Sequence, residues 1–125
     1  MKTIINSKNA PAPIGPYSQA VLAGSTLFAS GQIAINPATG ELEMSSIEIE
    51  TEQVMQNIKA VLEEADMTFE NIVKCSIFLS SMDSFSRVNE VYGKYFPTNP
   101  PARETVEVSC LPKSVNVEIS FIAIK

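Results

Sequence analysis

The sequence predicts an α/β two-layer sandwich, in which a mixed β-sheet carries two helices on one face. Apolar residues alternate with a period of two near both ends of the chain and once in its middle, and two other stretches show helical spacing. The connections between these stretches are short. With 125 residues, 45% of them hydrophobic, the chain is long enough to bury one core, so we expect a single domain over residues 1–125.

The first third of the chain is predicted to contain three strands and a proline-rich loop. Residues 2–5 form a short strand candidate, and residues 17–23 and 26–35 are predicted strands joined by a turn at Gly24-Ser25. Residues 10–16 contain three prolines, which fix φ and remove backbone donors. We therefore expect an ordered, extended loop there, and neither a helix nor a strand.

The middle of the chain is predicted to form a helix, a strand and a second helix. Apolar residues recur at helical spacing from Ile47 to Ala65, which predicts one amphipathic helix. Residues 71–80 return to a period of two and form a predicted strand. The second helix is expected to begin at a cap on Asp83 or Ser84 and to run to about Phe96, before the prolines at 97, 100 and 101. Its expected apolar face comprises Phe85, Val88, Tyr92, Tyr95 and Phe96.

The end of the chain is predicted to form two strands, Ala102–Cys110 and Val115–Ile124. If they pair as an antiparallel hairpin, one face collects apolar side chains suited to packing under the helices. The other face then collects a polar stripe, which is ordinarily the solvated side of an antiparallel sheet. Alternation also places Glu104 under the helices, where a charge is costly unless it is paired. The stripe consists of Arg103, Thr105, Glu107, Glu118 and Ser120.

The composition argues against several classes of function. The chain has no histidine, which removes Ser-His and Cys-His nucleophile pairs and most zinc and non-haem iron sites. Cys75 and Cys110 lie far apart and outside any CxxC pattern, so neither a disulfide scaffold nor a zinc site is expected. A formal net charge of -5 disfavours nucleic acid as a partner. No segment has the length and apolarity of a membrane span or signal peptide, so we expect a cytoplasmic protein without membrane contact.

Four ordered motifs together span nearly the whole chain. They are APAPIGPYSQ at residues 10–19, SGQI at 30–33, VNEVY at 88–92, and PAR, VEV, LPK and VEI between residues 101 and 119. These motifs resemble those of the RidA/YjgF family. The resemblance implies a chorismate-mutase-like fold and a homotrimer with three ligand clefts at the subunit boundaries. It also implies hydrolysis of the enamines and imines that pyridoxal-phosphate dehydratases release from serine and threonine, giving 2-keto acids and ammonia without a metal or organic cofactor.

The resemblance assigns roles to particular residues. Arg103 would bind the substrate carboxylate, because a guanidinium makes a bidentate and always charged pair with it. Glu118 would orient and deprotonate the water that attacks the imine carbon of a 2-iminobutanoate or 2-iminopropanoate type of substrate. No metal site is expected. The residues expected to bind the substrate are Tyr17, Ser30, Gly31, Asn89 and Thr105.

The chain departs from the family pattern after Arg103. Many relatives have a small residue followed by a cysteine where this chain has Glu104 and Thr105. If the cysteine side chain took part in the chemistry, Thr105 could not replace it, whereas a role for the backbone N–H alone would be retained.

Other readings of the same residues stay open. Singly, Tyr17 could be a core aromatic, Asn89 an exposed helix residue and Ser30-Gly31 a β-bulge. Glu118 could pair with a surface lysine. One alternative function is that of an endoribonuclease or translation inhibitor, against which the acidic charge and missing histidine argue. The other is a regulatory protein that binds a small ligand without catalysis; the presence of both Arg103 and Glu118 favours catalysis over it.

Overall fold

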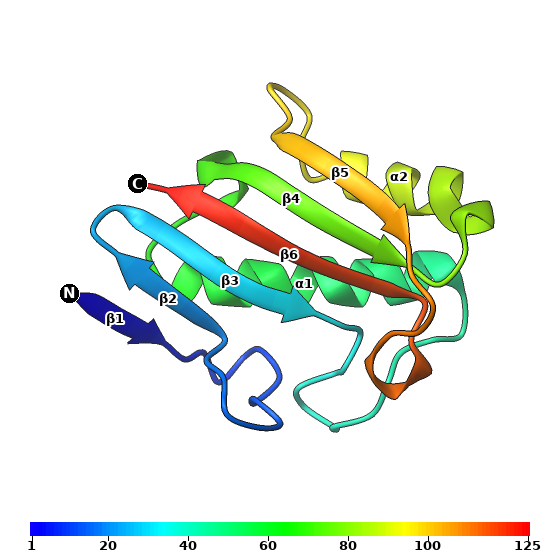
Figure 1. Ribbon diagram of the computed structural model, residues 1–125, viewed down its shortest axis with the longest axis horizontal. Helices are drawn as coiled ribbons and strands as arrows, with labels where there is room; N and C mark the ends of the chain where they lie inside the picture. Colours follow the sequence, from blue (N-terminus) through cyan, green and yellow to red (C-terminus); the bar gives the residue numbers. More distant parts are fainter.

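A six-stranded mixed sheet with both helices on one face makes up the protein, shown in Figure 1 as a computed structural model that describes residues 1–125. The predicted fold class is confirmed. Neither helix combines the length and apolarity that crossing a membrane would require. The elements are β1 (Lys2–Ile5), β2 (Ala20–Ala23), β3 (Thr26–Gln32), α1 (Ile47–Glu64), β4 (Ile72–Leu79), α2 (Phe85–Gly93), β5 (Ala102–Glu107) and β6 (Val117–Ile124), with short 3-10 turns η1 (Phe69–Asn71), η2 (Met82–Ser84) and η3 (Pro112–Ser114).

The strands are ordered β1-β2-β3-β6-β4-β5 across the sheet, so the predicted hairpin of the last two strands is wrong. β4 lies between them, antiparallel to β6 and parallel to β5. The physical reason is that α2 connects β4 to β5. Two strands joined through a helix usually lie parallel and side by side, so β5 pairs with β4. β6 then pairs with the other edge of β4.

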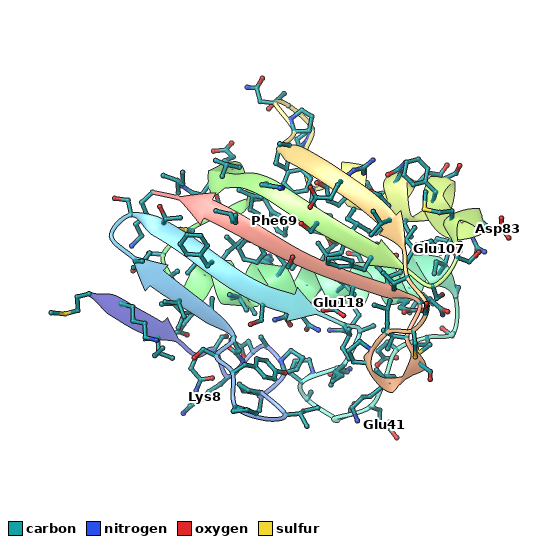
Figure 2. The ribbon with its side chains drawn as sticks, viewed as in Figure 1. Lys8, Glu41, Phe69, Asp83, Glu107 and Glu118 are labelled. Carbon is teal, nitrogen blue, oxygen red and sulfur yellow. The ribbon has the colours of Figure 1, made fainter.

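This pairing also separates side chains that the predicted polar stripe had placed together. Arg103 is paired with Cys75, which is 1% exposed under the helices, whereas Glu118 is paired with Phe78. Because paired residues point to the same side of a sheet, Arg103 and Thr105 lie on the helix side and Glu118 lies on the open side. Figure 2 shows Glu118 on β6, on the side of the sheet facing away from the helices.

The expected burial of Glu104 under the helices is wrong for the same reason. Its paired residue is Ser76, on the open face, and the Ser76 hydroxyl donates to the Glu104 carboxylate. Lys74 lies 3.1 Å from the same carboxylate. These contacts hold the pKa of Glu104 below its ordinary value, with the Ser76 hydrogen bond as the largest cause and Lys74 as the next. Val106 of β5 is likewise on the open face, 41% exposed, and not under the helices.

The helices pack on the sheet through the stripe that periodicity predicts. α1 begins at the Ser46 cap, whose side chain accepts from the Ile49 N–H, and its inward residues are fully buried. α2 begins after Ser84, one of the two predicted cap positions, although the Ser84 side chain makes no capping bond. The helix ends at Gly93, three residues before the predicted end at Phe96, because backbone bonds between residues three apart replace the helical ones over residues 94–96. Its apolar face is nevertheless in the core or packed against it: Val88, Tyr92 and Phe96 are buried, and Phe85 and Tyr95 are partly buried.

Candidate functional site

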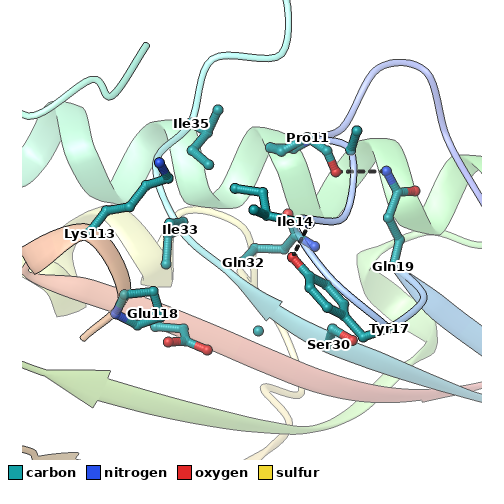
Figure 3. Close-up of a pocket in the computed structure, with 13 residues that line it drawn as sticks. Pro11, Ile14, Tyr17, Gln19, Ser30, Gln32, Ile33, Ile35, Lys113 and Glu118 are labelled. Atoms are coloured by element: carbon teal, nitrogen blue, oxygen red, sulfur yellow. Dashed lines mark hydrogen bonds between the residues drawn. The ribbon is translucent and has the colours of Figure 1, made fainter. Parts of the chain in front are cut away.

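A cavity of about 650 Å³ lies beside Glu118, between the end of β3, the start of β6, η3 and the proline-rich loop (Figure 3). Tyr17, Ser30, Gly31 and Glu118, all predicted as site residues, line this cavity. We call these four residues the Glu118 cluster. They come from three separate parts of the sequence, and the fold brings them around one cavity.

Glu118 is the group in the cavity with the chemistry of a base. Its carboxyl is half-buried and makes no hydrogen bond or ion pair within the chain, and burial raises its pKa above the ordinary value. A carboxyl with a raised pKa in a cleft is a candidate functional group, since its basicity moves toward neutral pH. The pairing of Glu118 with a surface lysine is therefore not found.

The Glu118 carboxyl occupies space that the absence of a Gly31 side chain provides. The register of β3 against β6 shifts between Ala29 and Gln32, so the predicted bulge at Ser30-Gly31 is present. A Cβ at Gly31 would overlap the carboxylate of Glu118. Ser30 is tied down at the same bulge, because its hydroxyl donates to Ser18 O at 2.7 Å.

Tyr17 brings a hydroxyl to the opposite wall of the cavity. It is 51% exposed, so the interpretation as a core aromatic is wrong. Its oxygen accepts a hydrogen bond from the Ile14 N–H at 3.3 Å, drawn as a dashed line in Figure 3. The phenolic hydrogen is not used in that bond, so it is available to a ligand.

Arg103 lies elsewhere, in a second group of side chains between β5 and α2. Its Nη1 donates to Asn89 Oδ1 at 2.7 Å, and its guanidinium lies 5.5 Å from the centre of the Phe85 ring and 5.2 Å from that of Tyr92. No carboxylate pairs with it. The guanidinium is exposed and oriented by neutral neighbours, and its remaining donors can bind an anion. We call Arg103, Asn89 and Thr105 the Arg103 cluster.

Two buried hydroxyls lack hydrogen-bond partners on this side of the sheet. They are Tyr92 Oη and Thr105 Oγ1, the latter on β5 two residues after Arg103. Buried polar atoms are normally paired, so the Thr105 hydroxyl is a group that a ligand or neighbouring chain could satisfy. Burial raises the pKa of the Cys75 thiol, which keeps it protonated and a poor nucleophile.

Within one chain, the structure brings the predicted site residues together in two clusters and does not unite them. The Glu118 cluster faces the open side of the sheet, and the Arg103 cluster faces the helices. A single chain therefore separates the two groups on which the predicted chemistry depends.

The sequence-based list of site residues omits three polar residues of the cavity, which are Gln19, Gln32 and Lys113. Gln32 is 6% exposed, yet its side-chain amide makes no hydrogen bond within the chain. Lys113 reaches the wall from η3. Gln32 and Lys113 belong to motifs of the family resemblance, SGQI and LPK, but nothing in the linear sequence says that they share a cavity with Glu118.

Buried amides hold two walls of the cavity in place. Asn57 of α1 donates to Ile33 O and Ile35 O, at 3.0 and 2.9 Å. Gln19 donates to Pro11 O at 2.9 Å, which fixes the proline-rich loop. These hydrogen bonds fix the backbone of Ile33, Ile35 and Pro11, whose apolar side chains line the cavity.

A buried carboxylate fixes the start of β6. Glu50 of α1 is fully buried and accepts hydrogen bonds from the backbone N–H groups of Asn116 and Val117, at 2.7 and 3.0 Å. Its other oxygen accepts from the Asn116 side chain at 2.9 Å. Glu118 is the next residue along the strand, so this clamp sets the position of the catalytic candidate relative to α1.

Comparisons with known proteins agree with the motifs. The family model described as "Endoribonuclease L-PSP" matches residues 7–125. A RutC family protein of Pyrococcus horikoshii is 50% identical over 125 residues, covering 100% of this chain and 99% of that protein. The crystal structure of YyfA from Yersinia pestis, a protein of the Rid family, superposes with a TM-score of 0.97 at 52% identity and covers 100% of both chains. The 2-iminobutanoate/2-iminopropanoate deaminase of Bos taurus is 42% identical over 125 residues, covering 100% of this chain and 91% of that protein.

Proposed function

Because the chain belongs to the endoribonuclease L-PSP family, also called the RidA/YjgF family, we propose that it hydrolyses reactive 2-imino acids to 2-keto acids and ammonia. The observation that carries the proposal is Glu118, an unpaired carboxyl with a raised pKa in a cavity that also offers hydroxyl groups. The identity with the Bos taurus deaminase supports the reaction class and the 2-iminobutanoate and 2-iminopropanoate substrates.

Each step of the proposed reaction can be assigned to a group in the cavity. The substrate is the protonated imine, and Glu118 accepts a proton from water while the water oxygen forms a bond to the imine carbon and the C=N electron pair moves to nitrogen. The resulting neutral carbinolamine carries a hydroxyl and an amino group on the same carbon. Glu118 gives its proton to the amino nitrogen and then accepts the hydroxyl proton as the C–N bond breaks, so that the carbonyl of the 2-keto acid forms and ammonia leaves, taking up that proton as ammonium. The Tyr17 hydroxyl has a free hydrogen to donate to the reacting centre.

The proposed contact to the substrate carboxylate belongs to Arg103, which in the same chain faces the opposite side of the sheet from Glu118. We therefore place the reaction in a homotrimer, in which the Glu118 cluster of one subunit meets the Arg103 cluster of its neighbour. Exposed apolar side chains on the open face, such as Phe28 at 49% and Val106 at 41%, support burial of that face against another copy. Arg103 would then supply the bidentate carboxylate contact across the boundary.

The proposal is tested in a threonine dehydratase reaction, by following the decay of the imine with and without the purified protein. We expect faster decay with the wild-type protein. Arg103→Ala and Glu118→Gln should each lower the acceleration by about 10²- to 10⁴-fold while the trimer stays folded in a sedimentation experiment. No acceleration by the wild-type protein would contradict the proposal, and tight binding of a 2-keto acid in that case would indicate a regulatory role.

A further inference from the structure

The cavity beside Glu118 contains a positive charge that the proposed reaction does not use. Lys113 is the one cationic residue among those that line the cavity, and Glu118 is the one anionic residue. Lys113 is exposed and forms no ion pair, and burial alone shifts the pKa of Glu118, with no opposing effect of Lys113. The ammonium group is therefore free for a ligand and does not neutralise the base.

The turn that carries Lys113 is held in an unfavourable backbone conformation. Lys113 and Ser114 have φ values of 55° and 57°, in the left-handed region that residues with a Cβ rarely adopt. Leu111 and Val115, on either side, are 7% and 1% exposed, so burial of these neighbours anchors the turn. Residues in unfavourable backbone conformations are often found at ligand-binding sites, where the surrounding structure keeps them in place. Here the turn places Lys113 in the lining of the cavity.

Gln32 provides an independent observation in the same cavity. The residue as a whole is 6% exposed, its side chain lines the cavity, and its amide makes no hydrogen bond within the chain. The amide is not among the fully buried polar atoms that lack a partner, so its donors and acceptor are accessible from the cavity. The apolar side chains of Ile33 and Ile35 line the cavity too, and in Figure 3 Ile33 is drawn between Lys113 and Gln32. The wall thus combines unused hydrogen-bond donors with an apolar surface suited to methylene groups.

We propose that Lys113 and Gln32 bind a carboxylate on the substrate side chain, so that the protein prefers 2-imino acids with an acidic side chain. The inference rests on the proposed function and specifies its substrate class. Without Lys113, a second carboxylate would be repelled by Glu118 in a partly desolvated cavity. The volume of about 650 Å³ falls within the range of drug-sized ligand pockets, so it has room for a side chain longer than that of 2-iminobutanoate.

Two stable keto acids of equal length test the preference without catalysis. 2-Oxoglutarate carries a terminal carboxylate that 2-oxopentanoate lacks, and calorimetric titration gives the dissociation constant of each with the full-length protein. We expect wild type to bind 2-oxoglutarate roughly tenfold to hundredfold more tightly than 2-oxopentanoate, the range of one charge-assisted contact. Lys113→Met and Gln32→Met should bring the ratio of the two constants toward one, and Lys113→Arg should keep it.

A matched control removes the same charge elsewhere. Lys59 is exposed on α1 and does not line this cavity, so Lys59→Met should leave the ratio at the wild-type value. A wild-type ratio near one, or a ratio that Lys113→Met does not change, would overturn the inference. Faster decay of 2-iminobutanoate in the dehydratase reaction reports on the proposed function separately, so either idea can fail without the other.

Discussion

At the scale of single residues, the absence of a side chain at Gly31 provides the space that the Glu118 carboxyl occupies. A bulge in β3 brings the Gly31 backbone against the carboxyl of Glu118, and any side chain at Gly31 would need the space that the carboxyl occupies. The glycine is therefore required by steric exclusion and not by its φ, since it is not among the positive-φ glycines.

We predict that Gly31→Ala lowers imine hydrolysis by about a hundredfold or more, because the methyl group displaces the general base. Turnover in the dehydratase reaction measures this loss. The double variant with Glu118→Gln should lose no more than Glu118→Gln alone, since both changes act on the same group.

Gly93→Ala serves as the matched control. Gly93 is the last residue of α2, and a Cβ there would meet nothing within 4 Å. Alanine should leave turnover unchanged and stabilise the helix by up to about 1 kcal/mol. Equal effects of the two glycine substitutions on turnover would show that the Gly31 contact has no special role.

At the scale of elements, the two helices are joined by a bidentate ion pair. Arg87 of α2 donates to Glu48 of α1 through Nε and Nη2, at 2.7 and 2.6 Å. The Arg87 hydrogen bond is the main cause that lowers the pKa of Glu48 from 4.5 to about 2. Both side chains are exposed, so the pair contributes modestly to stability and is weakened by salt.

The sign of this shift predicts a pH dependence of stability. Because the folded-state pKa of Glu48 is depressed, its stabilisation is present above pH 4.5 and is lost as the pH falls through about 2. Wild type should therefore unfold at a higher temperature than Glu48→Gln at pH 7, and the gap should shrink below pH 4.5. Glu63→Gln, which removes an exposed carboxylate without an ion-pair partner on the same helix, should show no such pH-dependent gap.

The contact between α1 and the cavity wall gives another prediction. Asn57→Leu leaves Ile33 O and Ile35 O without their side-chain donor, which should lower the free energy of unfolding by about 1–3 kcal/mol in urea titrations. Turnover should fall too, because the wall loses its anchor. Gln53→Met removes only the 3.0 Å bond to Asn57 Oδ1 and leaves both carbonyls paired, so its effect should be smaller.

The periodicity of apolar residues predicted the helices and strands well, but it predicted poorly which strands lie side by side in the sheet. The spacing from Ile47 to Ala65 predicted α1 to within one residue, because an amphipathic stripe records which side of a helix is buried. Alternation in the last two strands says which residues share a face of their own strand, and it carries no information about which strand lies alongside. The predicted hairpin failed for this reason, and the faces of Arg103 and Glu104 failed with it.

For the candidate site too, the sequence predicted which residues belong to it better than it predicted how they are arranged. The motifs named residues that the structure gathers into two clusters, but a one-dimensional pattern could not reveal that the clusters lie on opposite sides of the sheet. Gln32 and Lys113 were missed because their shared cavity arises only when η3 folds over the end of β3.

At the scale of the whole molecule, Arg103 and Glu118 lie on opposite sides of the sheet of one chain, so the proposed reaction needs a second subunit to bring them together. If each cleft takes Glu118 from one subunit and Arg103 from the next, two inactive variants can restore activity together. In mixed trimers of Arg103→Ala and Glu118→Gln, a cleft is complete when an intact Glu118 meets an intact Arg103 across the boundary. Random mixing of equal amounts should complete about a quarter of all clefts in a symmetric ring.

The measurement is imine decay after the two variants are unfolded together in denaturant and refolded as a mixture. Each variant refolded alone is the control, as is the mixture of the two separately refolded proteins, which contains no mixed trimers. Recovery near a quarter of wild-type turnover would place the two groups on different subunits of one cleft. If both groups acted within one chain, every chain of the mixture would lack either Arg103 or Glu118, whichever variant its neighbouring subunits were. Co-refolding would then restore no activity.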